Sequence, residues 1–241
     1  VLTFISIPGL AYRDDWFFLQ LALGYILGRI LVSIFLLPAY FKGGITSIYE
    51  VLGARFGKKI QKTASGVFLI TRILADGIRF LATAVIVQVV TGWSLPAAVL
   101  VIGVVTVIYT LMGGIRTVVW VDSFQFVLYL GGGLVAIFYI LAHSDIGFGT
   151  MISQLNAQGK LDIVRWGWDL FSEPWLFFSA VIGGMLLSFA SHGADYMMVQ
   201  RVLSCRDLSS AKKAIIGSGF FVFLQFAVFI LAGSMIYLYL G

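Results

Sequence analysis

Apolar residues along this chain form long runs that polar and charged residues interrupt only briefly. Several runs have, or nearly have, the roughly 20 residues that a helix needs to cross the hydrocarbon core of a bilayer. They cover residues 16–41, 62–91, 95–113, 119–142, 174–199 and 211–240, and residues 1–10 have the character of the end of a further run. The pattern predicts an all-α polytopic membrane protein in which residues 1–241 form a single transmembrane domain.

The composition supports this prediction. Of the 241 residues, 60% are hydrophobic and 11% are charged, and the mean hydropathy is +1.01, whereas a soluble domain carries about 25% charged residues. The single cysteine, Cys205, excludes an internal disulfide and fits no zinc-site spacing. The sequence offers no nucleophile–base pair and no metal cluster, so we expect neither an enzyme nor a cofactor.

Basic residues are distributed unequally between the connections. If residues 11–15 lie outside, the inner connections hold Lys42, Arg55, Lys58, Lys59, Lys62, Arg116, Arg201, Arg206, Lys212 and Lys213, and the outer loops hold Arg13, Lys160 and Arg165. This positive-inside bias supports that orientation. These thirteen residues are most of the sixteen Lys and Arg residues, so no nucleic-acid partner is needed to explain the net charge of +5, and membrane lipid is the expected surrounding. The remaining Arg29, Arg72 and Arg79 fall inside apolar runs.

Two connections are predicted to contain short helices. In the inner connection, Ser47 and Glu50 have the spacing of a capping box, which favours a helix along the inner membrane face. The outer loop 144–172 carries a short apolar pattern from Met151 to Leu155, which indicates a small surface helix.

Ionisable side chains inside an apolar run are candidates for a functional site, because burying them in a membrane is costly. In the run 62–91, Arg72, Asp76 and Arg79 fall within about 60° of one another on a helix. One carboxylate facing two guanidiniums leaves a positive charge that either Asp195 or an anionic ligand could satisfy. A purely structural ion-pair network is the alternative interpretation.

The run 174–199 is apolar but carries glycines and a polar patch near its end. Such a patch predicts an interrupted helix, whose free backbone groups and dipole ends commonly build the site of a transporter. Ser188, His192 and Asp195 follow the spacing i, i+4, i+7 and so are expected on one helical face. His192 fits a hydrogen-bonded packing residue as well as a proton carrier, while Asp195 must be paired, hydrated or protonated.

Three segments together resemble a known family. Gly113–Gln125, with the sequence GGIRTVVWVDSFQ, is similar to the signature of the sodium/solute symporter family, which includes sodium-coupled sugar, proline, pantothenate, monocarboxylate and iodide carriers. Gly44–Gly57 looks like the inner loop of that family, and Val199–Leu203, followed by Ala211–Lys213, looks like the motif after its interrupted helix. The resemblance covers nearly the whole chain.

The resemblance implies a partial leucine-transporter-like inverted-repeat fold. The first five-helix repeat is expected to be nearly complete to about residue 143, and residues of about 174–241 are expected to form the start of the second. It implies sodium as the coupling ion and a role for Asp122 near the inner sodium path, although by position alone Asp122 could pair with Arg116. The family's main sodium ligands are expected before Val1 and beyond Gly241, which makes the sequence look like a fragment.

The expected function is therefore sodium-coupled symport of a small organic solute by alternating access. The residues expected to bind the solute are Thr3, Arg72, Asp76, Arg79, His192, Asp195 and Tyr196. The two arginines of this set favour a carboxylate-bearing solute, while Ala22 and the pair Asp195-Tyr196 differ from the sugar-carrying members. A sodium/sugar symporter, a proton-coupled carrier and a symporter-like sensor module are the alternatives. A bacterial inner membrane is favoured as the location.

Overall fold

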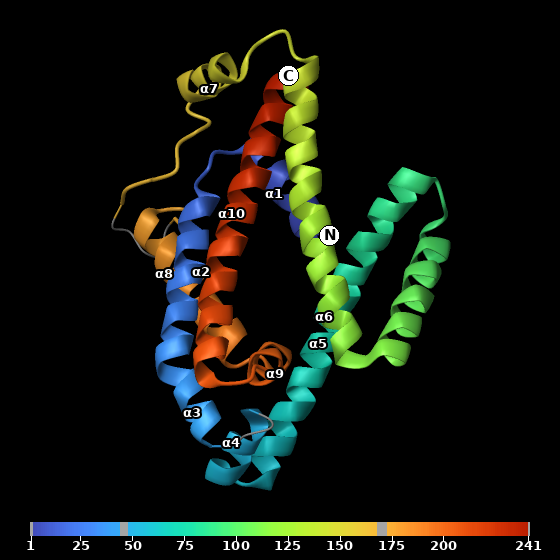
Figure 1. Ribbon diagram of the computed structural model, residues 1–241, viewed down its shortest axis with the longest axis vertical. Coiled ribbons are helices and arrows are strands. Elements are labelled where there is room, and N and C mark those ends of the chain that lie inside the picture. Colours follow the sequence, from blue (N-terminus) through green and yellow to red (C-terminus); the bar gives the residue numbers. More distant parts are fainter. Residues whose placement is uncertain (1, 44–47, 168–172, 241) are drawn as a thin grey trace.

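A computed structural model describes residues 2–43, 48–167 and 173–240 of the chain (Figure 1). Within these ranges the ordered elements are all helices. They are α1 (Leu2–Arg13), α2 (Phe18–Leu31), the π-helix η1 (Val32–Leu36), α3 (Leu37–Lys42), α4 (Ile48–Phe56), α5 (Lys58–Thr91), α6 (Leu95–His143), α7 (Phe148–Ala157), α8 (Phe177–Gly193), α9 (Tyr196–Leu203) and α10 (Leu208–Leu240).

The helices long and apolar enough to cross a membrane match the predicted runs. They are Phe18–Lys42, Lys58–Thr91, Leu95–Gly113, Thr117–His143 and Leu208–Leu240, together with the bent pair of α8 and α9. Two of these spans belong to α6, and Figure 1 shows its ribbon reversing direction between them. The predicted all-α polytopic fold is confirmed, so the protein is an integral, multi-pass membrane protein.

Helices α2 and α8 are held at close range by small residues. A Cβ atom added to Gly24 would collide with the carbonyl oxygen of Val181, and one added to Gly28 would collide with that of Met185. On the facing helix, a Cβ at Gly184 would collide with the backbone of α2. Glycines at such positions let two backbones touch, which is a common way to pack helices in lipid.

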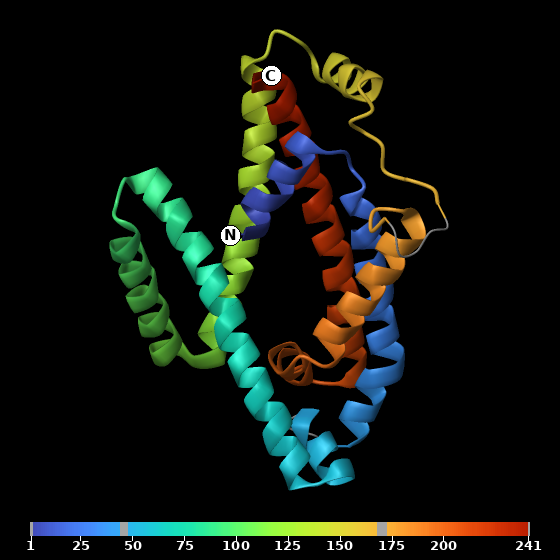
Figure 2. The ribbon, with the colours of Figure 1, turned by 180° about the vertical axis from the view of Figure 1, so that it is seen from behind.

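Helix α10 lies at the centre of the packing. Its residues Phe226, Phe229 and Ile230 form a buried cluster with α1 and α2. Toward the inner end, Ile215 packs with α3 and α9, and at the outer end Met235 packs with α6 and α7. Figure 2 shows α2, α8 and α10 on one side of the molecule, with α5 and the first half of α6 extending away on the other.

Both predicted short helices are present. Helix α4 follows the inner end of α3, although Ser47 of the proposed capping box lies outside the described residues. Helix α7 occupies the outer loop. Its Met151 and Leu155 are fully buried, and Met151 packs against the outer ends of α6 and α10. The apolar pattern in that loop therefore marks a packed helix.

The chain bends by 65° between α8 and α9, as the glycines and polar residues of that run predict. The carbonyl of Gly193, the last residue of α8, accepts a buried hydrogen bond from the Tyr40 hydroxyl at 2.7 Å. Gly193 also packs so closely on Leu36 that a Cβ atom would collide with its side chain. Leu36 ends the π-helical turn η1, and π-helical turns are frequent at functional sites.

Candidate functional site

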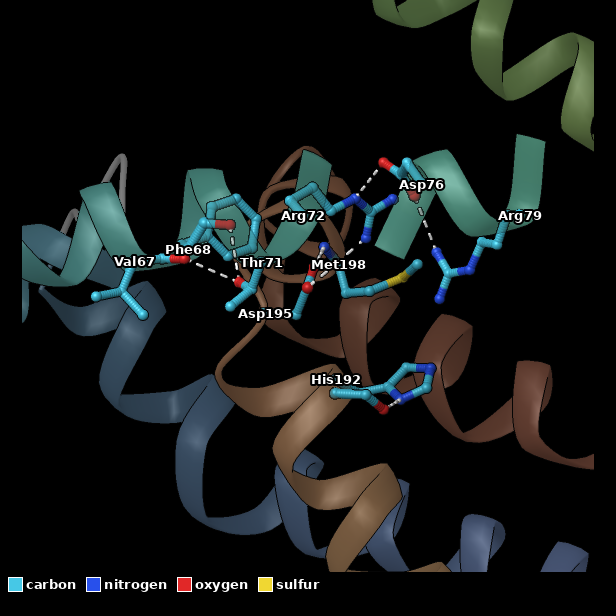
Figure 3. Close-up of polar contacts among 10 residues, drawn as sticks. Val67, Phe68, Thr71, Arg72, Asp76, Arg79, His192, Asp195 and Met198 are labelled. Carbon is cyan, nitrogen blue, oxygen red and sulfur yellow. Dashed lines mark hydrogen bonds and ion pairs between the residues drawn. The ribbon is translucent and has the colours of Figure 1, made fainter. Parts of the chain in front are cut away.

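Arg72, Asp76 and Arg79, predicted to share one side of a helix in the run 62–91, form a polar stripe on α5 with two ion pairs around one carboxylate. The guanidinium Nε of Arg72 contacts Oδ2 of Asp76 at 2.7 Å, and Nη1 of Arg79 contacts Oδ1 at 3.1 Å. Figure 3 shows Asp76 between the two arginines along one side of the helix. The hydroxyl of Thr83, one turn farther along α5, donates to the Arg79 carbonyl.

The break between α8 and α9 brings Asp195 to this stripe. One oxygen of Asp195 caps α9 by accepting from the Met198 N–H at 3.1 Å, and the other lies 3.9 Å from Nη1 of Arg72 (Figure 3). Arg72 therefore has a second partner carboxylate, which comes from another span; this is one of the two solutions that the sequence left open. Two arginines and two aspartates give the cluster a formal charge of zero.

The expectation that Asp195 shares a helical face with Ser188 and His192 is wrong. Helix α8 ends at Gly193, and Asp195 is the N-cap of α9 beyond the 65° bend. Helical spacing does not hold across this break. Asp195 lies near Arg72 of α5, whereas the Ser188 hydroxyl donates a hydrogen bond to the Tyr25 carbonyl of α2.

His192 is hydrogen-bonded within its own helix. Its Nδ1 atom lies 3.2 Å from the Ser188 carbonyl oxygen and 2.9 Å from the Ser191 hydroxyl. Figure 3 shows the imidazole apart from the contact between Arg72 and Asp195. This arrangement fits the packing role that the sequence left open, and a solute contact by His192 stays a prediction.

Tyr196 belongs to an aromatic cluster beside Asp195. Its ring stacks on Tyr49 of α4 with centroids 5.8 Å apart, and Phe68 of α5 lies 6.0 Å from Tyr196 and 5.9 Å from Tyr49. Burial raises the pKa of the Tyr49 phenol, and the carboxylate of Asp195 acts in the same direction. The phenol therefore stays protonated at neutral pH.

A groove of about 600 Å³ adjoins the stripe. Arg72, Asp76, Gly77 and Phe80 of α5 line it, and Val99 of α6 closes one side. The Arg79 side chain is 58% exposed and that of Asp76 48%, compared with 24% for both Arg72 and Asp195. Arg79 and Asp76 are therefore the members of the cluster that a ligand can reach most easily.

Asp122 is paired, but with a residue that the sequence did not suggest. Its Oδ2 atom lies 3.1 Å from Nη2 of Arg201, which belongs to α9. The side chain of Arg116, the partner considered from position alone, lies outside the described residues. Asp122 therefore connects the inner part of α6 to the motif that follows the break.

Thr3 and Arg29 lie on α1 and α2. Thr3 lies in α1, partly exposed, and its expected solute contact stays a prediction. Arg29 of α2 was not among the expected site residues, yet it is only 6% exposed; its position inside an apolar run was the signal that could have drawn attention to it. Among the described residues, no group of three or more His, Cys, Asp or Glu residues could hold a metal ion.

Comparison with known families decides the class of this protein. The model of the sodium:solute symporter family matches residues 2–240. The chain belongs to the sodium:solute symporter family. As a member of this family it has the partial leucine-transporter-like fold that the sequence motifs implied, and the family assignment made from those motifs is confirmed.

Individual relatives of this symporter-family chain agree. It is 30% identical over 230 residues to human sodium-coupled monocarboxylate transporter 2, which covers 95% of this chain and 37% of the relative. It is also 30% identical over 215 residues to the human sodium/iodide cotransporter, covering 88% of this chain and 33% of the relative. The chain thus spans about a third of the length of these curated relatives.

A solved structure is also similar. The substrate-bound outward-open state of a Na⁺-coupled sialic acid symporter, described as revealing a novel Na⁺ site, superposes with a TM-score of 0.86 at 27% sequence identity. The match covers 99% of this chain and 50% of the solved chain. The helical arrangement described above is therefore that of one part of a larger family fold.

Proposed function

We propose that the protein to which this chain belongs is a secondary active transporter that couples sodium entry to the uptake of a small, carboxylate-bearing solute by alternating access. The cluster of Arg72, Asp76, Arg79 and Asp195 carries the proposal. It joins α5 to the break between α8 and α9, and in transporters broken helices of this kind carry the binding site. Family membership and relatives that include sodium-coupled monocarboxylate transporters support it.

Charge balance favours sodium and a carboxylate together. The four side chains of the cluster carry a formal charge of zero. A carboxylate alone would leave the site with one negative charge, and a sodium ion alone with one positive charge, each costly in a low-dielectric membrane interior. When both bind, the site stays neutral. A guanidinium fork also matches a carboxylate in bidentate geometry, so Arg79, the more exposed arginine, is a suitable first contact.

We assign supporting roles to the other predicted residues. Tyr196 closes the site through the aromatic cluster, and Thr3 and His192 contact the solute in the complete protein. Asp122, paired to Arg201, lies on the sodium path. The repeat division at about residues 143 and 174, and a bacterial inner membrane as the location, belong to the same proposal.

Uptake by the full-length protein in proteoliposomes tests the proposal. Labelled carboxylates and neutral sugars are supplied with and without an inward sodium gradient, and a proton gradient is applied separately. We expect a carboxylate to accumulate only with sodium. Replacing both arginines, as in R72A/R79A, should raise the KM for that carboxylate by at least about tenfold, because each charge-assisted hydrogen bond contributes about 1.5–3 kcal/mol.

Controls separate the alternatives. Arg206 is exposed on the segment between α9 and α10, so Arg206→Gln should leave the KM unchanged. Uptake driven by protons alone favours the proton-coupled carrier, sodium-driven accumulation of a sugar alone favours the sodium/sugar symporter, and no uptake under either gradient favours the sensor module. Unchanged carboxylate uptake by the double variant would contradict the assigned site.

A further inference from the structure

Arg29 is a buried cation in the middle of a membrane span. It lies on α2 within the span Phe18–Lys42 and is 6% exposed. Its Nη1 atom donates to the Ser218 hydroxyl of α10 at 3.1 Å, while its Nε atom is buried and has no hydrogen-bond partner among the described residues. None of the described carboxylates forms an ion pair with it.

This situation differs from that of the other intramembrane arginines. Arg72 and Arg79 share Asp76, and Arg72 also approaches Asp195. Placing a charged side chain at the centre of a bilayer costs at least about 2.5–3.5 kcal/mol, and such residues almost always find a partner. A guanidinium has five N–H donors and no acceptor. Ser218 accepts from Nη1, and the buried Nε–H has no partner among the described residues.

Among the described groups that face Arg29, Ser218 accepts a hydrogen bond, and none carries a formal negative charge at neutral pH. Tyr25 lies one turn earlier on α2, and His192 of α8 is near enough to interact with the guanidinium electrostatically. From α10, Ser218 donates its own proton to the Ile215 carbonyl at 2.7 Å, so its oxygen lone pairs face the arginine. Gly219 allows the close approach, because a Cβ there would lie 3.3 Å from Cδ of Arg29.

We propose that Arg29 anchors a site for a small monovalent anion at the junction of α2, α8 and α10. The anion would accept hydrogen bonds from the Nε edge of the guanidinium and supply the counter-charge that these helices lack. No described ion pair or hydrogen bond joins Arg29 to the Arg72 cluster, so this site is additional to the proposed solute site. The occupant is either an inorganic halide or the carboxylate group of an organic solute, since both offer one negative charge to a guanidinium fork.

The test uses the purified full-length protein with chloride alone and with acetate alone as probes. Binding of labelled chloride and of labelled acetate is measured by equilibrium dialysis at constant sodium and constant ionic strength, with isethionate as the balancing anion. The unfolding midpoint is recorded over the same titrations, because a ligand that binds only the folded state raises it with concentration. The readout involves no transport, so failure of the proposed symport leaves it intact and its own failure leaves the symport proposal intact.

We expect saturable binding by the wild type that Arg29→Gln weakens by at least about tenfold, given the strength of charge-assisted hydrogen bonds. The exposed-site variant Arg206→Gln should bind like the wild type. Arg29→Lys, which keeps the charge but loses the fork, should fall between the two, and it replaces Arg29→Gln if that variant does not fold. Chloride binding identifies an inorganic occupant, and acetate binding without chloride binding identifies a carboxylate. The proposal is overturned if the wild type binds neither probe saturably, or if the Arg29 variants bind as tightly as the wild type.

Discussion

Two regions of equal hydrophobicity bury their residues very differently. The helix bundle, defined as α1, α2, α8 and α10, includes the span Phe18–Lys42. Within an apolar stretch of 18 residues in that span, 44% is buried. The outer hairpin, defined as α5 and Leu95–Gly113 of α6, is 6% buried in each of its two spans. Their mean hydropathies, 2.0 for the first span and 1.9 and 2.3 for the hairpin spans, hardly differ.

Hydropathy therefore marks a membrane span without indicating which helices the span packs against. Small residues at the contact carry that information. In the bundle, Gly24, Gly28 and Gly184 lie where a Cβ would strike the facing backbone, whereas Gly66 of α5 has open space around it. Charged groups follow the same division, because the hairpin pairs Arg72 and Arg79 within α5 while the bundle buries Arg29 between helices.

The largest expected effect comes from enlarging a contact glycine. A Cβ at Gly28 would collide with the Met185 carbonyl and lie 2.8 Å from Cβ of Ser188, so Gly28→Leu must push α2 and α8 apart. We expect a loss of at least about 3 kcal/mol of unfolding free energy, the upper part of the range for overpacking. The measurement is the yield of monodisperse full-length protein in detergent and its unfolding midpoint.

Gly66→Leu in α5 is the matched control. Nothing lies within 4 Å of the added Cβ, and replacing a helical glycine recovers up to about 1 kcal/mol of helix propensity. We expect wild-type yield and an unchanged or slightly higher midpoint. Equal damage from the two substitutions would mean that close packing does not distinguish the bundle from the outer hairpin.

A smaller effect is expected at the point where the bundle meets the candidate site. Tyr40→Phe removes only the hydroxyl that donates to the Gly193 carbonyl at 2.7 Å. An unsatisfied buried carbonyl costs about 1–3 kcal/mol, so the unfolding midpoint should fall. The end of α8 would also be held less firmly, and because Asp195 follows it directly, the KM for the transported carboxylate should rise.

The control for this prediction is Tyr139→Phe. Tyr139 lies on α6 and is 56% exposed, so loss of its hydroxyl should change neither the midpoint nor the KM. A fall in the midpoint of Tyr40→Phe without any change in KM would limit Tyr40 to a structural role. No change in either quantity would contradict the importance of the bond.

The sequence predicted the spans well because their length and apolarity are local properties. It also predicted the break after α8 from its glycines and the stripe on α5 from helical spacing. It could not predict that Asp195 turns toward Arg72, because the direction of the chain after a bend depends on what holds the bend, here Tyr40 and Leu36.

The sequence also could not predict which residues far apart along the chain contact one another. Asp122 pairs with Arg201, 79 positions away by their numbers, at 3.1 Å, and no spacing rule connects two residues on different helices. Tyr49 and Phe68 join Tyr196 from two further elements. The isolation of Arg29 is also a three-dimensional fact, because an arginine inside an apolar run gives no indication of whether a carboxylate faces it.

The smallest expected effect concerns how the helices of the two regions begin. Helix α10 has a side-chain cap, since Asp207 accepts from the backbone N–H of Ser210 at 2.8 Å and from its hydroxyl at 3.1 Å. Helix α5 starts after Gly57 with no side-chain cap. These bonds from Ser210, the backbone bond first, hold the pKa of the Asp207 carboxyl below its ordinary value.

A carboxyl group with a lowered pKa in the folded state stabilises that state above its ordinary pKa of about 3.9. The stabilisation is lost as the pH falls through the lowered value. Asp207→Ala should therefore lower the unfolding midpoint slightly at pH 7, and the difference from the wild type should shrink as the carboxyl group of the wild type becomes protonated.

Asp207→Asn keeps a neutral cap, so its difference from Asp207→Ala should not vary with pH. Asp145→Ala, which removes an exposed acid from the loop after α6, serves as the control. A gap between Asp207→Ala and the wild type that stayed constant from pH 7 to pH 3 would show that the charge of Asp207 contributes nothing to the start of α10.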